Sequence, residues 1–121
     1  MLRVDAFGYR QIFKQAKRLV SEGRQQLEAA ENFALKADDY FDVCEYSRFE
    51  EKKEAAYQKK ETGLSNIEEG LELYRSLLIY ENIDHFNRIK TAMRYTLDEF
   101  DHCLSDTTIK RYYDALFIGP E

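Results

Sequence analysis

The sequence predicts a soluble, all-α protein: an antiparallel helical bundle of three to five helices with one long, coiled-coil-like helix at the N-terminus. The 121 residues include only one proline and five glycines, which leaves little of the turn chemistry that a β-fold requires. Hydrophobic residues make up 44%, and nine tyrosines and eight phenylalanines argue against disorder. Apolar residues also recur at helical spacing. The length favours a single domain over residues 1–121.

The first helix is expected from about residue 4 to residue 45. Its apolar residues recur every seven positions in stripes offset by three and four, as a buried seam requires. One stripe consists of Phe13, Val20, Leu27, Ala34 and Phe41. The next consists of Tyr9, Ala16, Gly23, Ala30, Ala37 and Cys44. Because this second stripe is made mostly of small residues, we expect another helix to approach it closely. A third stripe widens the face with Ile12, Leu19, Phe33 and Tyr40.

The segment after this helix is rich in charge. Residues 50–61 carry eight charges in twelve positions but remain good helix formers, and the apolar pattern returns over residues 64–78. Thr62-Gly63 could end one helix, and Ser65 with Glu68 has the spacing of a capping box for the next. One continuous helix over residues 47–81 and two helices divided at this point therefore both stay open.

Two further helices are expected towards the C-terminus. Asp84 is the predicted N-cap of the first, whose buried stripe is Phe86, Ile89, Met93, Leu97, Phe100 and Leu104. Residues 105–108 form a cap-rich break. A short last helix carries Ile109, Tyr112, Tyr113, Leu116 and Phe117, and Gly119-Pro120 would stop it. The short connections predict that neighbouring helices pack antiparallel.

The charge and the cysteines limit the classes of function. A net charge of −5 disfavours general nucleic-acid binding. No stretch approaches the roughly 20 apolar residues of a membrane span, and the N-terminus lacks the apolar run of a secretory signal. Cys44 and Cys103 both lie in apolar patterns, so we expect buried, reduced thiols in a cytoplasmic protein, with a single disulfide as the alternative.

No catalytic signature occurs in the sequence, so neither an enzymatic activity nor a cofactor is expected. Glu99 and His102 have the Glu-x-x-His spacing of carboxylate-bridged metal sites in helical bundles. His85 lacks the matching acid, because Asn82 stands three residues before it. A metal- or small-ligand-binding bundle that uses Glu99 and His102 is therefore an alternative to the main hypothesis, and two ordinary surface histidines are the expectation.

The long first helix carries the most suggestive pattern for a function. Arg3, Arg10, Lys17 and Arg24 are spaced seven residues apart, and the same register continues as Glu31, Asp38 and Glu45. Flanking charges of this kind set partner choice and orientation in coiled coils. Three uses of this charge ladder are open: alignment of the helix against its own neighbours, steering of a protein partner, and weak nucleic-acid binding through the four cations.

The C-terminal aromatic residues form a second candidate contact. Tyr112 and Tyr113 are adjacent, so they cannot face the same way on a helix, and at least one is expected to be exposed near Phe117. Tyrosine is frequent among the residues that dominate binding energy in interfaces.

Together these features predict a non-enzymatic protein–protein interaction module. The roles that fit a small acidic helical protein are adaptor, chaperone and inhibitor, including inhibitors in phage or bacterial conflict. The predicted partner-binding residues are Arg3, Arg10, Lys17, Arg24, Tyr112, Tyr113 and Phe117. The expected partner is another protein, and a homodimer through the long first helix is a further possibility.

Overall fold

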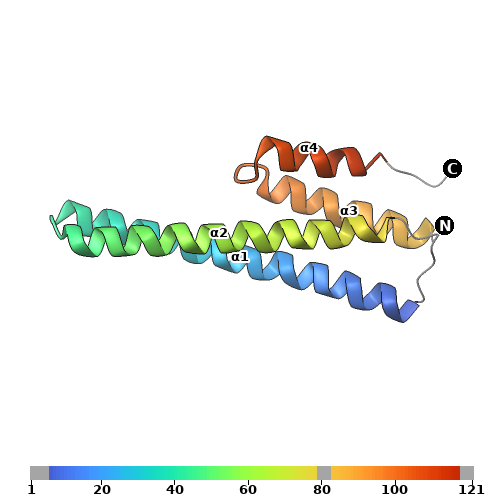
Figure 1. The fold of residues 1–121 in the computed structure, drawn as a ribbon, viewed down its shortest axis with the longest axis horizontal. Coiled ribbons are helices and arrows are strands. Elements are labelled where there is room, and N and C mark those ends of the chain that lie inside the picture. The colour runs from blue at the N-terminus through green and yellow to red at the C-terminus, as the bar shows by residue number, and fades with distance from the viewer. Residues whose placement is uncertain (1–5, 79–82, 118–121) are drawn as a thin grey trace. The chain divides into compact units, whose positions relative to one another are not determined.

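The computed structural model describes residues 6–78 and 83–117, and every regular element within these ranges is an α-helix. The helices are α1 (Ala6–Asp42), α2 (Tyr46–Leu77), α3 (Ile83–Phe100) and α4 (Asp106–Ala115). This confirms the all-α class and the long N-terminal helix (Figure 1). In the described ranges, no helix has both the length and the apolar character that crossing a membrane would take.

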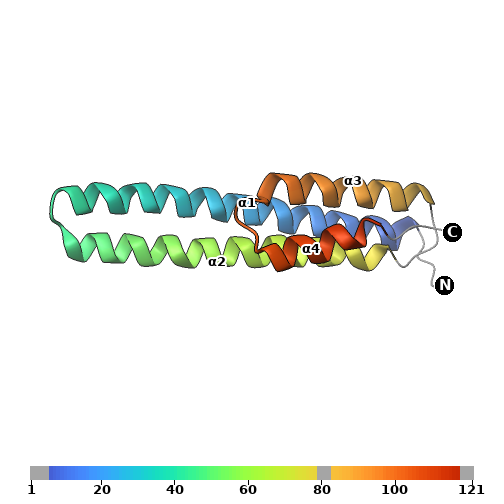
Figure 2. The ribbon, with the colours of Figure 1, turned by 90° about the horizontal axis from the view of Figure 1, so that it is seen from above.

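The chain divides into two compact units. The first comprises Met1–Val20 and Glu68–Glu121, and the second comprises Ser21–Ile67. Both α1 and α2 contribute residues to each unit, whereas α3 and α4 belong to the first. Successive helical stretches of the first unit run in opposite directions, and α3 packs against α4 (Figure 1, Figure 2). The assignment of residues 1–121 to a single domain stays a prediction.

In the second unit, α1 and α2 form an antiparallel hairpin that is closely packed at two buried glycines, Gly23 and Gly63. A Cβ atom added at Gly23 would lie 2.6 Å from Cγ1 of Ile67 and 2.7 Å from the carbonyl oxygen of Gly63. One added at Gly63 would lie 2.9 Å from the carbonyl oxygen of Gly23. Neither position has room for a methyl group. Because Ala30 and Ala37 are also buried, the predicted close approach along the small-residue stripe is confirmed.

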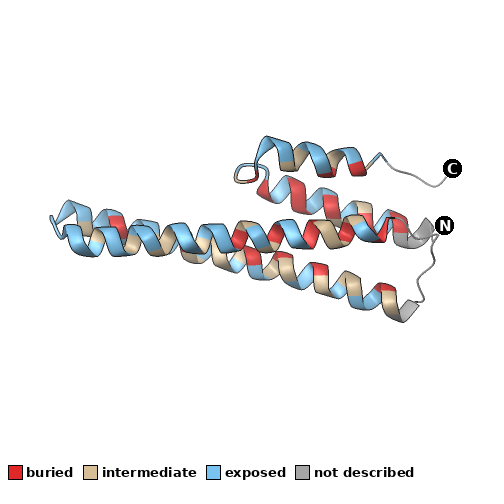
Figure 3. Cartoon of the chain, viewed as in Figure 1, coloured by how far each residue is buried: buried red, intermediate tan, exposed pale blue. Residues whose placement is uncertain are grey.

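The first unit repeats this close approach and adds a larger apolar core. A Cβ atom at the buried Gly70 of α2 would lie 2.8 Å from Cγ2 of Val20 and 2.9 Å from the carbonyl oxygen of Ala16. Figure 3 shows buried positions along α3 and the last part of α2. The whole stripe predicted for the third helix is buried, namely Phe86, Ile89, Met93, Leu97, Phe100 and Leu104.

The structure decides between the two alternatives for the middle of the chain, because α2 is one unbroken helix. The prediction of a break at Thr62-Gly63 is wrong. The Thr62 hydroxyl donates a hydrogen bond to the carbonyl oxygen of Gln58 (2.9 Å), one turn back in the same helix. The residue after it, Gly63, stays helical and serves the close packing in the hairpin. Ser65 is an exposed mid-helix residue and not a cap.

Most helix ends agree with the expected positions to within a few residues. The end of α1 at Asp42 precedes the expected residue 45. Because α3 begins at Ile83, Asp84 lies inside its first turn and is not the N-cap. Ser105 does cap α4, since its hydroxyl accepts a hydrogen bond from the backbone N–H of Thr108 (3.2 Å). The stop predicted at Gly119-Pro120 lies outside the described residues.

Candidate functional site

The charge ladder of α1 points largely to solvent. Arg10, Lys17, Glu31 and Asp38 are exposed, whereas Arg24 is half-buried and interacts with other groups of the chain. Arg3 lies outside the described residues. The Nζ atom of Lys17 lies 5.4 Å from the centre of the Phe13 ring, which is a cation–π contact within its own helix.

The ladder has little support from ion pairs inside the chain. Glu45 pairs with Arg48 at 3.6 Å, three residues along. Within the described ranges, Arg10, Lys17, Glu31 and Asp38 form no ion pair. An intramolecular role for the ladder would need such pairs to neighbouring helices. These four side chains are instead available to a partner from outside the chain.

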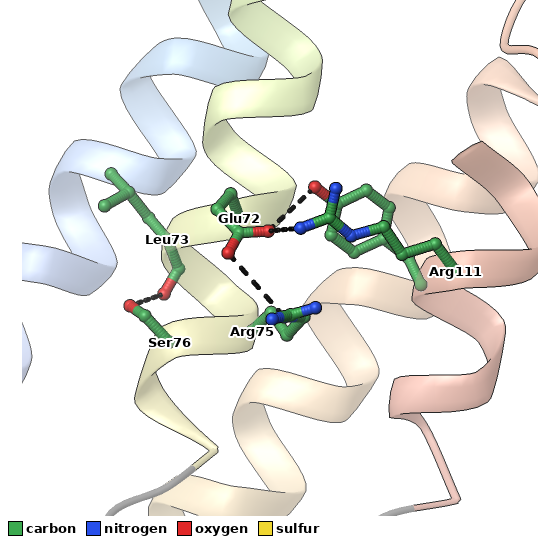
Figure 4. Close-up of polar contacts among 6 residues, drawn as sticks. Glu72, Leu73, Arg75, Ser76 and Arg111 are labelled. Atoms are coloured by element: carbon green, nitrogen blue, oxygen red, sulfur yellow. Dashed lines mark hydrogen bonds and ion pairs between the residues drawn. The ribbon is translucent and has the colours of Figure 1, made fainter. Parts of the chain in front are cut away.

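The adjacent tyrosines of α4 occupy different environments. Tyr112 is buried, with 4% of its surface exposed, and its hydroxyl donates a hydrogen bond to Oε2 of Glu72 on α2 (3.0 Å). Burial, and after it the hydrogen bond to Glu72, raises the pKa of Tyr112 to about 12. Figure 4 shows the Glu72 carboxylate between Arg75 and Arg111. Its Oε1 atom lies 3.6 Å from Nε of Arg75, and its Oε2 atom lies 3.2 Å from Nη2 of Arg111. Tyr112 therefore anchors α4 on α2, and its ring is closed to a partner.

The other two aromatic residues of this end are more accessible. Tyr113 is half-buried, and its hydroxyl donates a hydrogen bond to Oδ1 of Asp98 on α3 (2.6 Å). This hydrogen bond, with smaller contributions from burial and from nearby Asp101, raises the pKa of Tyr113. Phe117 has 86% of its surface exposed. Of the three aromatic residues predicted as a contact, Phe117 is the one that the structure leaves most open.

A cluster that the sequence reasoning missed lies at the turn between α1 and α2. Phe41, Val43 and Tyr46 are 51%, 65% and 55% exposed, and we call these three residues the turn patch. The Phe41 ring lies 5.7 Å from that of Tyr46 and 5.2 Å from that of Phe49. The turn patch therefore combines two aromatic rings in contact, Phe41 and Tyr46, with the exposed Val43 between them in the sequence.

The backbone that presents the turn patch is a well-defined helix cap. The N–H of Cys44 donates to the carbonyl oxygen of Phe41 (3.0 Å), and the N–H of Glu45 donates to that of Tyr40 (2.9 Å). These two hydrogen bonds form a Schellman motif, in which the residue after the helix adopts a left-handed conformation. Cys44 occupies that position with φ of 60°. The motif fixes the turn between Phe41 and Tyr46.

One sequence signal could have revealed the turn patch. The apolar stripe of α1 continues to Phe41, but α2 has only Tyr46 and Phe49 as large apolar residues before the charged segment over residues 50–61. The end of the apolar stripe of α1 therefore has few apolar side chains of α2 to cover it. Ala34 and Phe41, both expected in the buried seam, are accordingly exposed. The prediction of burial is wrong for both residues.

The cysteines and the candidate metal residues lie at or near the surface. Cys44 is exposed, Cys103 is half-buried, and neither forms a disulfide. The prediction of burial is therefore wrong for Cys44, because α1 ends before it. Glu99 and His102 are exposed. Among the described residues, no group of three or more His, Cys, Asp or Glu side chains is placed to hold a metal ion.

Three surfaces thus remain as candidates for binding: the charge ladder, the end of α4 with Phe117, and the turn patch. The turn patch is the one in which three exposed large apolar residues are close in sequence and two of them, Phe41 and Tyr46, are in ring contact. No family model matches the chain, and neither the curated proteins nor the solved structures include one that is significantly similar to it.

Proposed function

We propose that the chain is a non-enzymatic protein-interaction module, acting as an adaptor, chaperone or inhibitor, and that it binds its partner through the turn patch. The observation that carries the proposal is the exposure of Phe41, Val43 and Tyr46 at a turn that a Schellman motif holds in place. Aromatic residues dominate binding energy in many interfaces when a partner covers them. A preformed turn also lowers the conformational entropy lost on binding.

The binding free energy available from burial of the turn patch suits a specific but reversible contact. Burial of a large apolar side chain contributes about 1.5–3 kcal/mol, and each residue of the turn patch still has at least half of its surface to bury. The exposed carboxylates of Asp39 and Glu45 are close in sequence to the patch. The partner surface should therefore be apolar at its centre, with Lys or Arg side chains at its rim.

The compartment of this proposal is the cytoplasm. Two cysteines that form no disulfide fit a reducing environment, in which structural disulfides are rare. Whether the chain acts as an adaptor, a chaperone or an inhibitor depends on what its partner does. A binding experiment therefore tests the contact surface first.

The experiment compares capture of proteins from host-cell extract by three immobilised forms of the chain. In the test variant, Phe41→Ser is combined with Tyr46→Ser. In the matched control, Tyr57→Ser removes a tyrosine of similar exposure (59%) that lies outside the patch. We expect a protein that wild type and control retain and that the test variant loses. A partner retained equally by all three forms would contradict the turn patch as the contact surface.

A further inference from the structure

The outer face of α1 carries two rows of residues whose charge changes sign near the middle of the helix. One row is Arg10, Lys17, Arg24, Glu31 and Asp38, and the other is Lys14, Ser21, Glu28, Leu35 and Asp42. The rows are offset by three and four residues, so in a continuous helix they form one strip, which we call the charge strip. Every side chain of the charge strip is exposed except those of Ser21 and Arg24, which are half-buried.

Like charges are neighbours within each half of the charge strip. Lys14 lies four residues after Arg10 and three before Lys17, and Asp42 lies four residues after Asp38. Such pairs destabilise a helix on its own. Within the described ranges, no ion pair inside the chain offsets this repulsion for Arg10, Lys14, Lys17, Glu28, Glu31, Asp38 or Asp42. A partner with the opposite order of charges would offset it.

We propose that this partner is a second copy of the chain, with the two α1 helices packed antiparallel about a two-fold axis between Leu27 and Glu28. A two-fold interface pairs each residue with its counterpart in both directions. Lys17 then faces Asp38 of the second copy, and Arg24 faces Glu31 of the second copy. Each contact occurs twice in the dimer.

The second row of the charge strip is offset by one residue from this axis, a shift of about 1.5 Å along the helix. Lys14 therefore lies near Asp42 of the second copy, and the small Ser21 lies near Leu35, a leucine that is 59% exposed in the single chain. The two Glu28 side chains meet at the axis, and this like-charge contact is outweighed by the opposite-charge contacts of Lys14, Lys17 and Arg24. A parallel dimer would instead place each charge beside the same charge of the other copy. The change of sign along the charge strip therefore favours the antiparallel arrangement over the parallel one.

This inference goes beyond the proposed function, because it uses a different face of α1 and a different partner. The turn patch contributes none of its three residues to the charge strip. A dimer formed through the charge strip would display two turn patches, one from each copy, for other proteins to bind.

Sedimentation equilibrium of the full chain tests the pairing. Wild type should approach twice the chain mass of 14.4 kDa at low salt. Dissociation should increase as the ionic strength rises towards about 1 M, where charges are screened within about 3 Å. Lys17→Asp and Asp38→Lys should each raise the dimer Kd by on the order of tenfold or more, because two attractive contacts become repulsive. The double variant, Lys17→Asp with Asp38→Lys, should restore dimerisation.

The matched control is Lys60→Asp, the same change at an exposed residue of α2 outside the charge strip, and it should leave Kd unchanged. Circular dichroism checks that each variant stays helical. A wild type that is monomeric at millimolar concentration would overturn the inference, as would a double variant no stronger than either single one. If wild type is monomeric while the turn-patch variant still loses its captured protein, this inference fails and the proposed function stands. If wild type dimerises while the turn-patch variant keeps its captured protein, the proposed function fails and this inference stands.

Discussion

Replacing Gly23 with alanine tests whether close packing of α1 on α2 stabilises the second unit. In an uncrowded helix this change would be favourable by about 1 kcal/mol, because alanine has the higher helix propensity. Here the new Cβ would lie 2.6 Å from Cγ1 of Ile67 and 2.7 Å from the carbonyl oxygen of Gly63. The isoleucine side chain can change its rotamer, but the carbonyl oxygen can move away only if the two helices separate.

The expected cost follows from these two contacts. Overpacking in a well-packed core costs about 1–3 kcal/mol. Because the new Cβ would meet a backbone oxygen, the cost of Gly23→Ala should lie towards the upper end of this range. After the gain in helix propensity is subtracted, the unfolding free energy should fall by about 1–2 kcal/mol. In a chain of this length, each kcal/mol lowers Tm by roughly 4 °C.

Urea denaturation followed by far-UV circular dichroism measures this difference. Ser65→Ala, at an exposed position of α2, serves as the control and should change the unfolding free energy by less than about 0.5 kcal/mol. An unfolding free energy for Gly23→Ala equal to that of wild type, or above it, would contradict close packing of α1 on α2 at this position. The helices would then be too far apart, or too adjustable, for Gly23 to matter.

Two further predictions concern the turn and the tyrosine of α4. Cys44→Gly should raise the unfolding free energy by about 0.5–1 kcal/mol, because glycine adopts the left-handed φ of 60° without steric cost. Urea denaturation measures this change, and a lower unfolding free energy would contradict the Schellman geometry. The pKa of Tyr112 is raised to about 12 in the folded chain by burial and by Glu72, so folding favours its protonated form. Unfolding free energy should therefore fall as pH rises from about 10 to 12, and less steeply in Tyr112→Phe. Equal slopes for the two proteins would exclude Tyr112 as a contributor.

The parts of the fold that follow from spacing alone were predictable. The Gly and Ala residues at every seventh position of α1 leave room for a neighbouring backbone, and Gly23, Ala30 and Ala37 are indeed buried. The stripe of α3 is buried throughout because its apolar residues recur at helical spacing without interruption. In both cases burial depends on the spacing of residues within one helix, so the sequence of that helix is enough to predict it.

The parts that depend on a distant segment were not predictable in this way. Thr62-Gly63 has the composition of a helix end, yet Gly63 is helical because Gly23 of α1 packs against it. The choice between Tyr112 and Tyr113 for burial depends on Glu72, 40 residues away in the sequence. Phe41 is exposed because it lies at the end of the hairpin, where contact with the rings of Tyr46 and Phe49 still leaves 51% of its surface uncovered. Each outcome requires knowledge of what the opposite element presents.

The antiparallel pairing of α1 is the most specific claim that these surfaces support, and one distance measurement tests it directly. Cys44 is an exposed free thiol, so a spin label attached there in a Cys103→Ser background reports one separation between copies by double electron–electron resonance. An antiparallel dimer centred between Leu27 and Glu28 places the two labels about 50 Å apart, at 1.5 Å per helical residue. A separation below about 20 Å would indicate parallel or turn-to-turn association. That result, or the absence of any dipolar coupling between copies, would contradict the pairing.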